Sequence, residues 1–163
     1  MYEIAILYIL NKYDATIYRV AKIIDEFFFS CFKSSLGTIN PTLKRLEKAG
    51  CVVSTDKMSE GGMLSKIYSI TPEGKKHLTD LLLSFKSVNP YHILNDTKAV
   101  LYCSDVLTSS EYAEFKENIL NMLELHRIKL EKGLKNEYIT LNNIQRKIAE
   151  HTLEETTKLI QLL

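Results

Sequence analysis

The sequence predicts a mainly α-helical protein that carries one small two-stranded β-hairpin. Apolar residues recur at helical spacing over most of the 163 residues, and the pattern changes to that of strands only between residues 51 and 70. The composition is typical of a folded globular chain, because 45% of the residues are apolar, 25% are charged, and only 6 are Gly and 3 are Pro. The apolar runs fall well short of the roughly 18 residues that a membrane-spanning helix needs.

Three short helices are expected in the first fifty residues. Residues 2–12 contain an apolar stretch that surrounds the helix, so neighbouring elements must cover it on two sides. Asp14 is a plausible N-cap for a second, amphipathic helix. A third helix stops at Gly50, which can adopt the left-handed conformation after a helix end. The apolar face of this third helix consists of Leu36, Ile39, Leu43 and Leu46.

A hairpin is expected to follow the third helix. Residues 51–55 and 66–70 are rich in β-branched and aromatic side chains, which favours two short strands. Glu60, Gly61 and Gly62 lie between them and supply turn chemistry.

The fourth helix has a clear start signal. Thr71, Pro72 and Glu73 provide the cap, the first-turn proline and the first-turn acid of a helix that runs through about Phe85. Three helices, a hairpin and a helix, in that order, are the elements of a winged helix-turn-helix. The fold class that we predict is therefore mainly α with a small two-stranded β-wing, a winged helix-turn-helix followed by a helical region.

The chain after a break at Asn89 and Pro90 is expected to be helical to its end. A short segment over 97–107 precedes Thr108 and Glu111, which have the spacing of a capping box. One long helix is expected from there to about Lys135, and another over roughly 139–163. Each could reach roughly 35–40 Å at 1.5 Å per residue.

The apolar sides of these long helices predict a dimer, because little of the remaining chain is left to cover both of them. A second copy is expected to do so, and the second face of the first helix is expected to pack on the partner's C-terminal helices. A plain intramolecular hairpin that rests on the first domain is the alternative. The expected dimerisation residues are Ile6, Ile9, Phe115, Ile119, Met122, Leu141, Ile144, Ile148, Leu159 and Leu162.

The third helix has an outward face suited to double-stranded DNA. Its N-terminal half offers hydroxyls and an amide, which can read base edges, and its C-terminal half offers cations, which can meet phosphates. A solvated surface without function is the alternative for such a face. The expected base-reading residues are Ser34, Ser35, Thr38, Asn40 and Thr42, the expected phosphate-binding residues are Lys44, Arg45 and Lys48, and Lys57 and Lys66 are expected to steady the wing.

The charge distribution agrees with an anionic partner for the first half of the chain. The whole chain has a formal charge of +1, but residues 1–87 hold 12 Lys and Arg against 9 Asp and Glu, whereas residues 88–163 hold 9 against 11. We expect residues 1–87 to be a DNA-binding domain and residues 88–163 to be a helical dimerisation domain.

Three stretches of the sequence resemble the PadR family of bacterial transcriptional regulators. The most specific is the Gly-Thr-x-x-Pro-x-Leu-x-x-Leu pattern over 37–46, which Gly50 follows. The others are the hairpin with Gly61 and Gly62 and the Tyr-Ser-Ile-Thr-Pro-Glu-Gly sequence over 68–74. The resemblance implies a homodimeric repressor that binds a two-fold operator and, in many members, releases it when a small-molecule effector binds.

The chain also departs from the family pattern at three places. Asn40 stands where the family usually has Tyr, and Thr16 and Ile17 stand where it tends to have His and Gly, so that only Tyr18 is kept there. The wing is less basic than is usual. DNA affinity is therefore expected to be weak or strongly dependent on sequence.

Other classes of function find little support. The sequence has no phosphate-binding glycine loop, no metalloprotease motif and no nucleophile elbow, so we expect no enzyme, no cofactor and no metal. Its three cysteines have no CxxC spacing and its N-terminus has no basic stretch before the apolar run, which predicts a cytoplasmic protein. The alternative function is a winged-helix module that binds another protein without binding DNA tightly.

Overall fold

The computed structural model describes residues 1–163 except 59–63, 88, 90, 137 and 139. Three helices, the two strands and then further helices follow one another in the predicted order, and the fold class is confirmed. The elements are α1 (Tyr2–Lys12), α2 (Ile17–Phe27), α3 (Leu36–Lys48), β1 (Val52–Met58), β2 (Leu64–Ile70), α4 (Pro72–Leu83), α5 (Ile93–Tyr102), the 3-10 turn η1 (Ser104–Val106), α6 (Ser109–Leu134) and α7 (Asn143–Leu162). The expected turn residues 60–62, Pro90 and the expected helix start at 139 lie outside the described residues.

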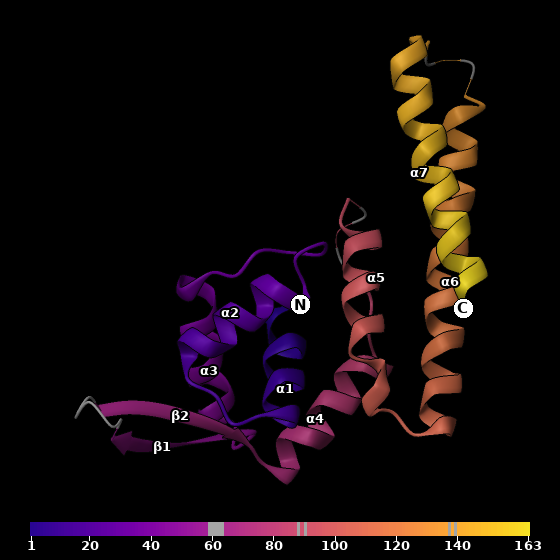
Figure 1. The fold of residues 1–163 in the computed structure, drawn as a ribbon. Helices are drawn as coiled ribbons and strands as arrows, with labels where there is room; N and C mark the ends of the chain where they lie inside the picture. The colour runs from indigo at the N-terminus through magenta and orange to yellow at the C-terminus, as the bar shows by residue number, and fades with distance from the viewer. Residues whose placement is uncertain (59–63, 88, 90, 137, 139) are drawn as a thin grey trace.

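The wing is an antiparallel pair of strands that projects from the helical body (Figure 1). Its register pairs Val52 with Ile70 and Met58 with Leu64. Ala15, in the link between α1 and α2, exchanges two backbone hydrogen bonds with Tyr68 of β2, at 3.0 and 2.9 Å. The wing is thereby tied to the start of α2 as well as to α3.

Helix ends follow the predicted cap chemistry with one correction. Thr16, not Asp14, is the N-cap of α2, and its hydroxyl accepts a hydrogen bond from the backbone N–H of Arg19. The extended conformation that Ala15 needs for pairing with Tyr68 delays the helix by two residues. The predicted capping box of Thr108 and Glu111 is confirmed, and Gly50 has the predicted positive φ, at 73°.

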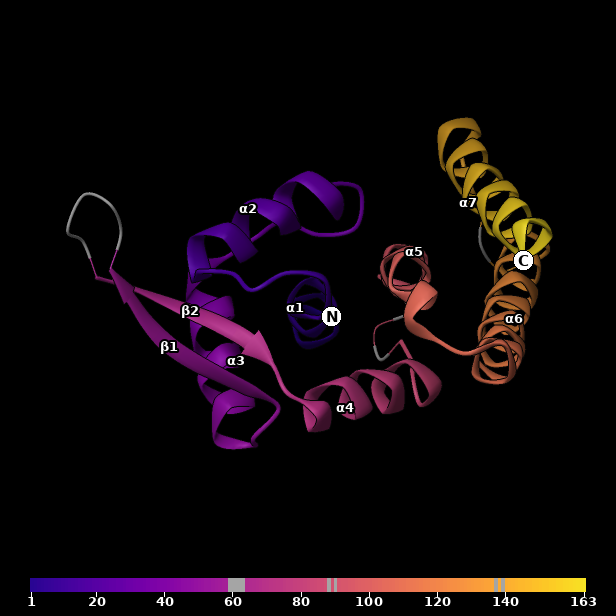
Figure 2. The same ribbon diagram turned by 60° about the horizontal axis from the view of Figure 1, so that its bottom comes forward.

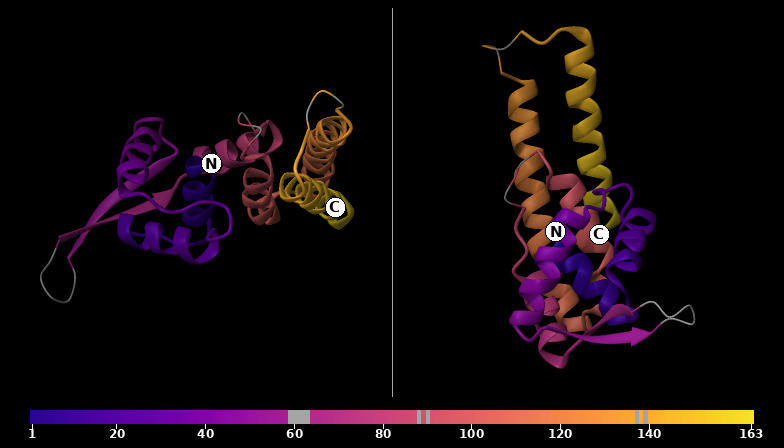
Figure 3. Two further views of the ribbon diagram at one scale, coloured as in Figure 1. Left: turned by 90° about the horizontal axis from the view of Figure 1, so that it is seen from above. Right: turned by 90° about the vertical axis from the view of Figure 1, so that its left-hand side faces the viewer.

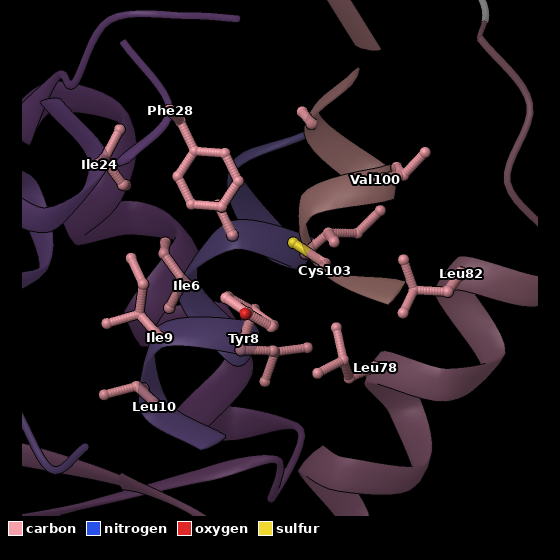
Figure 4. Packing of buried hydrophobic residues seen from close by; sticks show 14 of the residues in the cluster. Ile6, Tyr8, Ile9, Leu10, Ile24, Phe28, Leu78, Leu82, Val100 and Cys103 are labelled. Carbon is pink, nitrogen blue, oxygen red and sulfur yellow. The ribbon is translucent and has the colours of Figure 1, made fainter. Parts of the chain in front are cut away.

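Helix α1 lies at the centre of the core, and the chain itself covers it on every side. Figure 4 shows apolar side chains of α1 between those of α2, α4 and α5. Ile6 and Ile9 are completely or almost completely buried. The expectation that a partner covers the second face of α1 is therefore wrong for these two residues, because α4 and α5 occupy that side.

The C-terminal region consists of α5 against the core and a long antiparallel hairpin of α6 and α7 (Figures 1 and 3). The side-chain amide of Asn118 on α6 donates to the carbonyl of Phe85 at 2.9 Å, and Lys98 of α5 pairs with Glu155 of α7. These contacts hold the hairpin on the rest of the chain. Within the described residues, no helix is both long enough and apolar enough to span a lipid bilayer.

Burial divides the expected dimerisation residues of the hairpin into two groups. Phe115, Ile119 and Leu159 are buried within the chain, so they form its own core and are not available to a partner, contrary to expectation. The other five are partly or largely exposed: Met122, Leu141, Ile144, Ile148 and Leu162. The intramolecular hairpin thus accounts for part of the apolar surface and leaves the rest open.

Candidate nucleic-acid interface

One side of α3 presents a row of side chains to solvent, next to the wing. Leu36, Asn40, Lys44 and Lys48 follow one another at intervals of four residues, so they form one ridge along the helix, and all four are exposed. The opposite side, with Ile39, Leu43 and Leu46, is buried. In Figure 2, α3 and the wing lie at the far end of the molecule from α6 and α7.

Two of the residues expected to read bases have other roles in the structure. Thr42 is only 5% exposed, and its hydroxyl donates to the carbonyl of Thr38 at 2.8 Å, so the expectation that Thr42 reads bases is wrong. Ser34 is half-buried and donates to Asp25 from its backbone N–H, at 2.8 Å, and from its hydroxyl, at 2.6 Å. These hydrogen bonds lower the pKa of the Asp25 carboxyl and fix the loop that enters α3. Ser35, the N-cap of α3, and Thr38 are exposed.

Arg45 is held by a carboxylate from another helix. Its Nη2 donates to Oε2 of Glu3 on α1 at 2.7 Å, and Oε1 of Glu3 lies 2.9 Å from Nε2 of His77 on α4. Partial burial opposes ionisation of Glu3, but the hydrogen bonds from His77 and Arg45 outweigh it and lower the pKa of the carboxyl. An exposed ion pair of this kind contributes at most about 1 kcal/mol, so a phosphate can compete for Arg45.

Lys66 of the wing is paired as well. Its Nζ lies 3.8 Å from Oε1 of Glu47 on α3, and the hydroxyl of Ser54 donates to the same carboxylate oxygen. Glu47 thereby joins both strands of the wing to α3. Within the described part of the chain, Lys44, Lys48 and Lys57 have no carboxylate at ion-pair distance. They are the cations most readily available to a phosphate.

A groove of about 460 Å³ separates the N-terminal end of α3 from the wing and from the start of α2. Leu36 and Asn40 form its α3 side, and Tyr18 of α2 is 72% exposed at its edge. The wing side consists of Leu64, Ser65, Lys66 and Tyr68. Sequence reasoning did not place Leu36 or Tyr18 in the site; Leu36 was taken only as a core position, although it lies at the edge of the apolar face.

Comparison with known proteins agrees with the fold. Residues 6–80 match the family described as "Transcriptional regulator PadR-like family". No curated protein matches the chain. A PadR family transcription regulator from Clostridium difficile R20291 is 37% identical over 47% of this chain and 78% of its own, with a TM-score of 0.42.

Two solved structures of Bacillus subtilis PadR match over nearly the whole chain. The complex with operator DNA is 15% identical, with coverage of 99% of this chain and 97% of the other and a TM-score of 0.50, and it shows the same fold. The complex with p-coumaric acid is 18% identical, with coverage of 98% and 89% and a TM-score of 0.42. The match over residues 6–80, together with the 37% identity to the clostridial regulator, shows that this chain belongs to the PadR-like family of transcriptional regulators.

Proposed function

We propose that the chain is a sequence-specific, operator-binding repressor that acts as a homodimer. The observation that carries this proposal is the ridge on α3, where an apolar residue, an amide and two cations lie in a row beside the wing, and neither cation has a carboxylate partner among the described residues. A helix that enters the major groove with its N-terminal end needs base-reading groups there and cations further along. The operator complex of Bacillus subtilis PadR is the precedent within the family.

The second part of the proposal assigns different roles to the two parts of the chain. Residues 1–87 bind DNA, and residues 88–163 form the dimer. Ile144 and Leu162 of α7 are 70% and 79% exposed, and exposed apolar side chains of this size on a long helix are suited to a second copy. A two-fold dimer then presents α3 twice, at a spacing that must match one turn of DNA, about 34 Å.

The third part is release by a small-molecule effector. A hollow of about 530 Å³ lies between α1 and α2, with Tyr8 and Phe27 in its wall and Lys12 and Arg19 among its lining residues. That volume is within the range of small-molecule sites, about 300–1,000 Å³. Aromatic acids are the compounds to test first, because rings can stack on Tyr8 and Phe27 while a carboxylate meets the cations.

Fluorescence anisotropy with labelled DNA from upstream of the protein's own gene tests the proposal. The wild-type chain is expected to bind this duplex far more tightly than a scrambled duplex of equal length. Lys44→Ala combined with Lys48→Ala removes two phosphate contacts per subunit, so the slope of log affinity against log salt should fall by about 1.8 per subunit. The control is Arg146→Ala with Lys147→Ala, which removes the same charge from exposed positions on α7.

The outcomes separate the proposal from its alternative. Equal effects of the two double variants, or no preference over scrambled DNA, would contradict operator binding through α3. A dimer that binds no duplex would instead favour a winged-helix module that binds another protein.

A further inference from the structure

The groove between α3 and the wing is lined in part by side chains that binding to a phosphate backbone would not require. Its α3 side consists of Leu36, which is 44% exposed, and Asn40 one turn later. Neither side chain carries a charge, so neither attracts a phosphate electrostatically, and an exposed leucine at the open end of a helix is unfavourable in water. An apolar side chain and an amide are instead groups that can contact base edges in the major groove.

Each of the two side chains matches a feature of an A·T pair. The carboxamide of an asparagine can donate from its NH₂ group to adenine N7 and accept from the adenine N6 amino group, which is the pairing that identifies adenine in the major groove. An apolar side chain recognises thymine through its C5 methyl group. Because Leu36 and Asn40 are adjacent on the ridge, their targets must be adjacent base pairs.

The neighbouring residues indicate which end of the α3 ridge enters the major groove. Lys44 and Lys48 continue the same ridge toward the C-terminal end of α3, where cations are suited to phosphates at the edge of a major groove. Tyr18 of α2 and Lys66 of the wing line the groove opposite this ridge. The apolar and amide end of the ridge is therefore the end that lies deepest in the major groove.

We propose that Asn40 and Leu36 determine sequence specificity by recognising two adjacent base pairs, an adenine through its N6 and N7 atoms and a thymine through its methyl group. This inference rests on the proposed operator binding and adds the identity of the bases and the residues that read them.

Base analogues in a duplex selected by the full-length chain itself test the inference. Selection from a random library of about 30 base pairs, long enough for two half-sites one turn apart, yields the probe. Each adenine is then replaced by 7-deazaadenine, which lacks the N7 acceptor, and each thymine by uracil, which lacks only the methyl group. Replacing one adenine, which recurs by symmetry in the other half-site, should weaken binding by about tenfold. Replacing a thymine adjacent to it should weaken binding by about fourfold.

The variants assign these effects to residues. The 7-deazaadenine effect should disappear in Asn40→Ala, and the uracil effect should disappear in Leu36→Ala. Both residues are exposed, and circular dichroism melting checks that the variants fold. Lys48→Ala is the control, because the loss of a phosphate contact should weaken all probes equally and leave both analogue effects unchanged.

The result distinguishes the inference from the function on which it rests. If the selection yields no preferred duplex, operator binding itself is wrong. If a preferred duplex binds tightly but tolerates every analogue, or if the analogue effects persist in Asn40→Ala and Leu36→Ala, the chain binds an operator and the assignment of these two residues is overturned.

Discussion

Gly74 lies in the first turn of α4, packed closely against Cys51, which follows α3, and replacement by alanine should destabilise the fold strongly. A Cβ atom on Gly74 would lie 2.0 Å from the carbonyl oxygen of Cys51 and 2.8 Å from Cγ1 of Ile70. Carbon atoms do not approach a backbone oxygen so closely, so the first turn of α4 must move by about 1 Å from the turn that ends α3.

That movement disrupts two hydrogen bonds across the same junction. The N–H of Thr71 donates to the carbonyl of Cys51 at 3.0 Å, and the Thr71 hydroxyl donates to the carbonyl of Gly50 at 2.6 Å. Overpacking costs about 1–3 kcal/mol, and each hydrogen bond contributes about 1 kcal/mol. Gly74→Ala should therefore lower the free energy of unfolding by about 3–5 kcal/mol, and the Tm by roughly 6–20 °C for a chain of this length.

The assay is thermal unfolding followed by circular dichroism, at equal protein concentrations because the proposed dimer couples stability to concentration. Gly133→Ala is the matched control, since a Cβ there meets no atom within 4 Å and alanine favours a helix by up to about 1 kcal/mol. Gly133→Ala should leave the Tm unchanged or raise it. A Tm for Gly74→Ala within 2 °C of the wild type, on the order of the error of such a measurement, would refute the steric argument.

Four further predictions concern charge, capping and assembly. The lowered pKa of Glu3 contributes stability that is present above the ordinary pKa of 4.5 and is lost as the pH falls through the folded-state value. Glu3→Gln should therefore reduce the loss of Tm between pH 7 and pH 3. An unchanged loss would contradict the role of this carboxylate. The same variant frees Arg45 and should raise DNA affinity at low salt by roughly two- to fivefold, and lower affinity would mean that Glu3 positions Arg45 for DNA. Thr108→Ala should destabilise the chain by about 1 kcal/mol in chemical denaturation, because the capping box of α6 is lost; a change below about 0.3 kcal/mol would show that α6 is fixed by packing alone. Ile144→Lys with Ile148→Lys should convert the proposed dimer to a monomer in light scattering, and a dimer of unchanged stability would place the interface elsewhere.

Local chemistry in the sequence was sufficient to predict most of the elements and their ends. Thr71, Thr108 and Gly50 act in the predicted way because each cap depends on residues within four positions of it. The amphipathic pattern of α3 likewise separated its buried side from its exposed side. Base contacts by the exposed side remain a prediction.

Contacts between distant residues could not be predicted in this way. Both Asp14 and Thr16 have acceptor side chains suited to a cap, and the choice between them depends on the pairing of Ala15 with Tyr68, 53 residues further along the chain. In the same manner, the helical period of α1 shows that two sides must be covered but not that α4 and α5 cover one of them. The ion-pair partners of Arg45 and Lys66 could not be predicted for the same reason, since no sequence pattern marks Glu3 or Glu47 as a partner of these cations.

These carboxylates bear on how the protein can discriminate between DNA sequences. Nonspecific binding depends on the number of phosphates that cations neutralise. Because Glu3 and Glu47 pair with Arg45 and Lys66, a DNA phosphate gains less from those two cations than from Lys44 or Lys48. The electrostatic part of the affinity is thereby reduced for every sequence alike, whereas the proposed contacts of Asn40 and Leu36 with bases are not reduced. The preference for one sequence over another then depends on the base contacts, so Glu3→Gln should raise the affinity for scrambled DNA and for the selected duplex by a similar factor and leave their ratio unchanged.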